Sequence, residues 1–283
     1  MEKQFSYPDM KQSLGLLLRW LVYSLLAYIV VRLLHLDASV PASEDWYIFF
    51  IVRILTYSLP LILVIGRAYN LKRRYAGLPS TTTFVGNAKT RDLVLFALLA
   101  LLVSFFIDPL LLPFRQPTGL NKIMMNEMTG LIAPNFLSFI LIVILPPILE
   151  ELLFRGVILD GLLKNMSSRL AILISSALFG VIHMNPLQFV TAFILGLLIG
   201  WVYQKTRSLL ACMIMHATTN GIAWGYFLLF SQKMFLSEVL SGTPYILTVA
   251  FSFVAFLFLL YIASKRMKGR RLTNDNLQLA VDN

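Results

Sequence analysis

Long apolar runs separated by short polar turns dominate the hydropathy pattern of this chain. A helix that crosses a bilayer needs about 20 mainly apolar residues, and eight runs reach or approach that length. They cover residues 14–34, 46–65, 93–112, 134–156, 170–184, 187–203, 209–230 and 245–263. The fifth run is short and ends at His183, after which Asn185 can cap the next helix and Pro186 can take its first position. The pattern predicts an all-α, polytopic membrane protein with eight transmembrane helices.

The composition supports a lipid environment. Of the 283 residues, 58% are hydrophobic and only 13% are charged, whereas about a quarter of the residues in a soluble domain are charged. So few charges cannot cover a surface in water. We expect residues 1–271 to form a single transmembrane domain, and the polar residues 272–283 to form a disordered C-terminal tail.

The basic residues predict how the chain is oriented, because cytoplasmic loops are enriched in Lys and Arg. If the N-terminus is cytoplasmic, eighteen of the 24 Lys and Arg residues lie in cytoplasmic segments. Three lie in outside loops (Arg115, Lys122 and Lys233), and the remaining three lie within apolar runs. We therefore expect a multi-pass protein of the cell membrane with both termini in the cytoplasm. The net charge of +10 is spread over short loops without an aromatic-rich patch, which favours a lipid partner and argues against nucleic acid.

Three runs carry polar side chains that are costly inside a membrane and are therefore functional candidates. These side chains are Glu150, Glu151 and Arg155 in the fourth run, His183 in the fifth, and His216 and Asn220 in the seventh. Positions 150 and 183 are equally far from 166.5, which lies within the polar turn between their runs. An antiparallel hairpin thus puts Glu150 and His183 at one depth, facing each other. His216 follows the next cytoplasmic turn and can join them.

Spacing within the fourth run separates the roles of its charged residues. Glu151 and Arg155 are four residues apart, with Glu on the N-terminal side, which is the favourable order for a helical ion pair. Glu150 points about 100° away and is the freer carboxylate. The adjacent Pro146 and Pro147 remove two backbone donors, so we expect a kink that opens space beside the carboxylates.

The chemistry that these side chains allow is the activation of water. A carboxylate and a neutral imidazole can polarise a water molecule and pass its proton to a leaving amine. His216 and Asn220 project from one helix face, and together they can donate hydrogen bonds to the oxyanion of a tetrahedral intermediate.

The order Glu-Glu-x-x-x-Arg, Phe-x-x-x-His and His-x-x-x-Asn over residues 150–220 resembles the CAAX protease and bacteriocin-processing enzyme family, which includes prenyl-protein endopeptidases. The resemblance implies a motif core over residues 134–230 and an intramembrane endopeptidase. By resemblance, Glu150 and His183 activate the water, His216 and Asn220 stabilise the transition state, and Glu151 with Arg155 supports the first Glu. The expected substrate is a peptide or protein with a hydrophobic or lipidated segment, cleaved in peptide maturation or in bacteriocin self-immunity. We expect the active-site cavity to open towards the cytoplasm.

A zinc mechanism is an alternative, because Glu150, His183 and His216 have the ligand types of catalytic zinc. The His-Glu-x-x-His signature of common zinc proteases is absent from the sequence. A glutamate mechanism without a cofactor is therefore preferred.

Other interpretations of the polar residues stay open. Glu150 can serve a structural ion pair, His183 can be a packed core histidine, and Asn220 can link helices. Cys212 suggests a thiol protease, although a small buried hydrophobic residue is the simpler interpretation. A non-catalytic membrane partner of a sensor or enzyme would need none of this chemistry. A proton-coupled transporter would carry internal repeats, and the sequence shows none.

Overall fold

The computed structural model describes residues 7–35, 46–76, 84–115, 130–230, 233 and 235–281. Helices account for most of these residues, and no strand occurs among them. The all-α prediction is therefore confirmed for the part of the chain that the structure describes.

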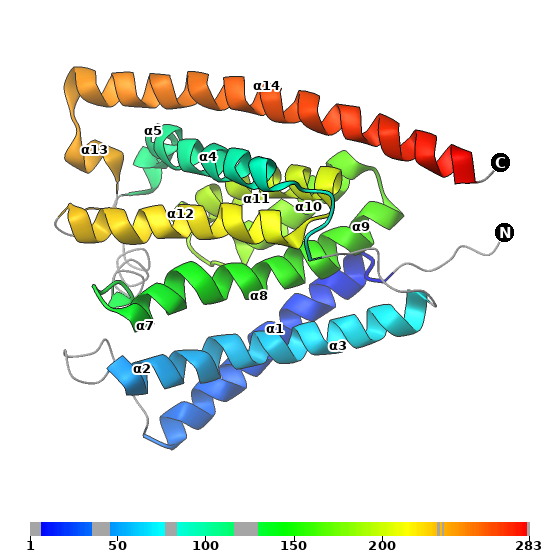
Figure 1. The fold of residues 1–283 in the computed structure, drawn as a ribbon. Helices are drawn as coiled ribbons and strands as arrows, with labels where there is room; N and C mark the ends of the chain where they lie inside the picture. Colours follow the sequence, from blue (N-terminus) through cyan, green and yellow to red (C-terminus); the bar gives the residue numbers. More distant parts are fainter. Residues whose placement is uncertain are drawn as a thin grey trace.

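The helices lie side by side in one bundle (Figure 1). The N-terminal half contains α1 (Met10–Leu33), α2 (Trp46–Arg53) with the π-helix η1 (Ile54–Ser58) and α3 (Leu59–Ala76), and then α4 (Thr90–Phe106), α5 (Asp108–Leu111) and the 3-10 helix η2 (Leu112–Phe114). One central span then consists of α7 (Phe136–Phe139), the π-helix η3 (Ile140–Ile144), α8 (Leu145–Leu153), the π-helix η4 (Phe154–Leu159) and α9 (Asp160–Asn165). The chain continues with α10 (Ser168–Val181), α11 (Pro186–Thr206), α12 (Leu209–Leu229), α13 (Leu236–Val239) and α14 (Gly242–Val281).

Several of these helices are long and apolar enough to cross a membrane. Within the described ranges there are five: Met10–Leu33, Trp46–Tyr75, Phe136–Asn165, Pro186–Thr206 and Gly242–Lys268. A sixth arises if α4 and the segment Asp108–Phe114, bent by 49°, are one span. Two of the eight predicted spans fall short. At 14 residues, α10 is only about 21 Å long, less than the roughly 30 Å of a hydrocarbon core, and α12 carries polar side chains in its middle. A multi-pass protein is confirmed, but the number eight is not.

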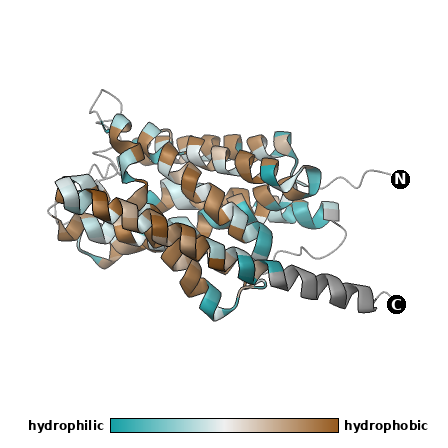
Figure 2. Ribbon diagram, turned by 90° about the horizontal axis from the view of Figure 1, so that it is seen from above, coloured by the Kyte–Doolittle hydropathy of each residue, from teal (hydrophilic) through white to brown (hydrophobic). Residues whose placement is uncertain are grey.

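The outer faces of the bundle are apolar. Leu18 and Leu25 of α1 and Phe251, Val254 and Phe258 of α14 are all exposed. Figure 2 shows hydrophobic residues along the lengths of the helices and hydrophilic residues mainly towards their ends. Exposed apolar faces of this extent suit a lipid environment, because a soluble monomer rarely tolerates them.

The start of α1 and the end of α14 lie at the same end of the bundle (Figure 1). We call this the terminal end, and we call the end that holds α5 and α13 the opposite end. Helix α14 continues to Val281, beyond residue 272, where the sequence predicts the start of the C-terminal tail. Residues 272–281 contain neither Gly nor Pro, and extending an existing helix is far less costly than starting one.

A buried carboxylate ties the helices together at the terminal end. The side chain of Asp160 is fully buried, and its oxygens lie 2.7 Å from Lys72 Nζ, 2.8 Å from Arg207 Nη1 and 3.2 Å from Lys164 Nζ. These contacts connect α3, the central span and the turn between α11 and α12. Since a buried charge is costly unless it is paired, the cluster fixes the three elements relative to one another.

Candidate active site

The central span and α10 form the antiparallel hairpin that the sequence predicts. Phe154 and Phe179 share the midpoint 166.5 with Glu150 and His183, and the Phe rings pack edge to face with centroids 5.0 Å apart. The same Phe179 ring lies 5.2 Å from the ring of His183 and 5.5 Å from that of His216. The packing around Phe179 therefore brings both imidazoles to the depth of the central carboxylates.

His183 lies in the turn after α10, and its orientation is set locally. Its Nδ1 lies 2.8 Å from the carbonyl oxygen of Phe179. A carbonyl only accepts hydrogen bonds, so Nδ1 carries the proton and Nε2 remains available to the site. The turn ends where Asn185 caps α11 by accepting from the N–H groups of Leu187 and Gln188, with Pro186 in the first position of the helix. This confirms the predicted helix start.

Glu151 connects Arg155 to His216. Its Oε1 lies 2.8 Å from Arg155 Nη1 and 2.9 Å from His216 Nδ1, and the carboxylate is fully buried. Arg155 also donates to the carbonyl of Gly196 at 3.3 Å, and its guanidinium lies 4.6 Å from the centroid of the Phe179 ring. The predicted ion pair is therefore present. The carboxylate of Glu151 also accepts a hydrogen bond from Nδ1 of His216, so that Nε2 of this imidazole is directed towards Glu150. A carboxylate orients the histidine of hydrolytic triads in the same way.

The carboxylate of Glu150 is buried, and only one of its two oxygens accepts a hydrogen bond from the described residues. Its Oε1 accepts a hydrogen bond from the hydroxyl of Tyr57. Its Oε2 has no hydrogen-bond partner among the described residues and lies 4.0 Å from His216 Nε2. The imidazole nearest to Glu150 is thus His216. The predicted direct approach of His183 to Glu150 is not seen in the described part of the chain, although both side chains line one cavity.

The side chain of Asn220 replaces a backbone hydrogen bond that the two prolines of the central span remove. Pro146 and Pro147 have no N–H groups, so the carbonyl of Ile142 lacks both its i+4 and its i+5 backbone donor. Nδ2 of Asn220 donates to that carbonyl at 2.9 Å. The break is accommodated as the π-turn η3 within a continuous span rather than as a sharp kink.

His216 and Asn220 bind different partners within the protein, Glu151 and the carbonyl of Ile142. Each has one polar atom bound within the protein, and each also lines the cavity. The second hydrogen of Asn220 Nδ2 and the Nε2 atom of His216 are the groups left to act there.

The cavity beside these residues has a volume of about 430 Å³, within the range of small-molecule sites. Apart from the site residues its wall is mainly apolar, with contributions from Leu141, Leu145, Leu187, Leu195 and Trp224. Glu150 lies midway along the span Phe136–Asn165. In a mainly apolar cavity at this depth, the electrostatic interactions of the site residues are stronger than they would be in bulk water.

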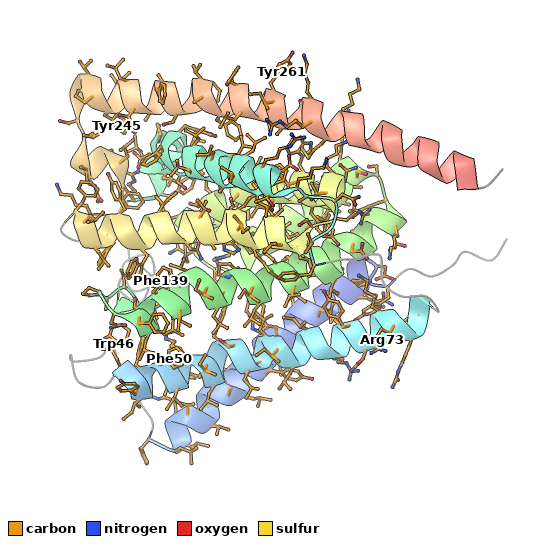
Figure 3. The ribbon with its side chains drawn as sticks, in the orientation of Figure 1. Trp46, Phe50, Arg73, Phe139, Tyr245 and Tyr261 are labelled. Atoms are coloured by element: carbon orange, nitrogen blue, oxygen red, sulfur yellow. The ribbon has the colours of Figure 1, made fainter. Side chains whose placement is uncertain are left out.

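The cavity extends from the site to the opposite end of the bundle. Its wall includes Arg53 of α2, Asp108 of α5 and Leu236 of α13. Figure 3 marks this end with Trp46, Phe139 and Tyr245, and the terminal end with Arg73. The sequence predicted a cavity that opens on the side of the termini, whereas the described cavity wall reaches the opposite end of the bundle.

Tyr57 is the site residue that sequence reasoning missed. It lies in η1, in an apolar run with no motif, and aromatic residues are common in membrane helices. Only the packing of η1 against α8 shows that its hydroxyl reaches Glu150.

The zinc alternative requires Glu150, His183 and His216 to meet. Among the described residues no group of three His, Cys, Asp or Glu side chains could hold a metal ion. The candidate ligand set is thus not assembled in this structure, and no step below involves a metal. Cys212 is buried, donates to the carbonyl of Ser208 at 3.1 Å and is not part of the cavity wall, as expected of a packing residue.

Comparison with known families agrees with this geometry. Residues 132–222, about a third of the chain, match the family model of the type II CAAX prenyl endopeptidase Rce1-like proteins, and the match includes every motif residue from Glu150 to Asn220. This segment therefore resembles the Rce1-like family. The match confirms the resemblance stated from the motifs and points to a membrane protease of the CAAX type. No curated protein and no solved structure matches the chain.

Proposed function

We propose that this protein hydrolyses a peptide bond inside the membrane with water activated by Glu150 beside the two imidazoles. The observation that carries the proposal is the buried Oε2 of Glu150. It has no hydrogen-bond partner among the described residues and lies 4.0 Å from His216 Nε2, on the wall of a cavity large enough for a peptide segment.

In the proposed reaction, Glu150 takes a proton from water while the water oxygen attacks the carbonyl carbon. The second hydrogen of the water is donated to Nε2 of His216, which Glu151 holds, and His183 lines the same cavity. The remaining N–H of Asn220 donates to the oxyanion, a kind of contact that can change the rate by about 10²–10³-fold. Glu150 then gives the proton to the leaving nitrogen as the C–N bond breaks.

The proposed substrate is a peptide or protein with a hydrophobic or lipidated segment. The apolar wall of the cavity supports this choice, because it offers few polar groups to a hydrophilic peptide. Maturation of a peptide or self-immunity against a bacteriocin are the proposed biological roles, by resemblance to the family.

Cleavage by the detergent-purified protein tests the function. The probe is a quenched fluorescent peptide that ends in a prenylated Cys-aliphatic-aliphatic-X sequence, together with its unprenylated form. Glu150→Gln keeps the size of the side chain but removes the base, so we expect the rate to fall by about 10²–10⁴-fold. His183→Ala and His216→Ala should also lose activity, whereas the exposed residue Glu238 provides the matched control Glu238→Gln.

Equal cleavage by the wild type and Glu150→Gln would reject the proposal in favour of a non-catalytic membrane partner. Measuring the metal content of the same samples decides between the glutamate mechanism and a metal-dependent one.

A further inference from the structure

The site has a closed side and an open side within the bundle. Towards the terminal end, residues 153–160 of the central span are all buried, and beyond them the Asp160 cluster joins Lys72 and Arg207. Towards the opposite end, the cavity continues past Thr191 to Asp108 and Leu236. A peptide can thus reach Glu150 through the opposite half of the bundle and not through the terminal half.

The charge of the loops assigns these two halves to sides of a membrane. Among the described residues, the basic side chains near the terminal end are Lys11, Lys72, Arg73, Arg74, Lys89, Arg91, Lys164, Arg169, Lys205, Arg207, Lys265, Arg266 and Lys268, whereas those near the opposite end are Arg32, Arg53, Arg115 and Lys233. Basic loops stay on the cytoplasmic side. The terminal end is therefore cytoplasmic, and the cavity faces the other side.

We infer that the substrate reaches the site from the extracytoplasmic side. The cleaved bond then lies in an apolar peptide segment that has already crossed the membrane or is inserted into it from outside, such as the hydrophobic part of an exported peptide. A protein that stays in the cytoplasm cannot place its C-terminus in this cavity. The inference rests on the proposed function for the identity of the substrate and on the charge distribution for the direction.

Cysteine labelling of the full-length protein tests the direction without any need for proteolysis. Thr191→Cys places a thiol in the cavity wall. Lys233→Cys and Lys205→Cys, both at exposed positions, mark the opposite and the terminal end. The parent protein carries only Cys212, which is buried and provides the background. Each variant is treated with a membrane-impermeant thiosulfonate reagent in intact cells and in inverted vesicles.

We expect Thr191→Cys and Lys233→Cys to react in intact cells, and Lys205→Cys to react only in inverted vesicles. Labelling of Thr191→Cys only in inverted vesicles, or in neither preparation, would overturn the inference. Labelling of Lys205→Cys in intact cells would overturn it too, because the bundle would then be inverted. If Thr191→Cys reacts from outside but the purified protein cleaves no peptide, the direction stands and the proposed hydrolysis fails.

Discussion

The hydrogen bond from Tyr57 to Glu150 gives a specific test of the proposed mechanism. Tyr57 lies outside residues 132–222, the segment that matches the family. Its ring packs edge to face on Trp20 of α1, with centroids 5.7 Å apart, and its hydroxyl donates to Oε1 of Glu150. Tyr57→Phe keeps the ring and its packing and removes only the donor that holds the carboxylate.

The size of the effect follows from the charge of the acceptor. A hydrogen bond to a charged group contributes about 1.5–3 kcal/mol. If Glu150 must be held in place as the water proton is transferred, that energy is lost from the transition state. At about 1.36 kcal/mol for each factor of ten, kcat/KM should fall by about 10- to 150-fold.

The assay is the peptide cleavage described above, with two further proteins. Tyr69→Phe removes a hydroxyl three turns further along the same helical segment, away from the cavity wall, and should leave kcat/KM close to the wild-type value. In the Glu150→Gln background, Tyr57→Phe should cause little additional loss, because the two residues act as a unit. An unchanged rate for Tyr57→Phe, or an equal loss in both backgrounds, would refute the role of Tyr57 in holding Glu150.

Three further outcomes follow from the same contacts. Arg155→Met leaves the buried carboxylate of Glu151 without its cation and should destabilise the protein by about 3–5 kcal/mol, seen as a lower thermal unfolding midpoint in detergent. Adding Glu151→Leu to Arg155→Met should recover much of the lost stability, and a double variant as unstable as Arg155→Met alone would contradict the reasoning. Asn220→Ala leaves the carbonyl of Ile142 without a donor and should cost about 1–3 kcal/mol of stability as well as activity; an unchanged unfolding midpoint would contradict the contact. Dialysis against a chelator should leave the cleavage rate unchanged under the glutamate mechanism, and a loss that zinc restores would favour the metal-dependent alternative.

The sequence determined the features that depend on spacing along one helix or across one turn. The i,i+4 separation of Glu151 and Arg155 fixed their ion pair, Asn185 and Pro186 fixed the start of α11, and equal distances from one turn indicated that Glu150 and His183 lie at one depth, where both line one cavity. Each of these follows from the helical repeat and from a short connection. Few other arrangements are compatible with such constraints, so local reasoning was sufficient.

Contacts between distant helices depended on the tertiary structure. The helical repeat does not say how far a helix is rotated or which neighbour it meets, so the sequence could not show that Tyr57 reaches Glu150 or that His216 binds Glu151. For the same reason the sequence could not show that Asn220 donates to the carbonyl of Ile142, although Pro146 and Pro147 indicate that this part of the helix lacks backbone donors. The end of the bundle that the cavity reaches also depends on how the helices pack in three dimensions, which the pattern of apolar runs does not encode.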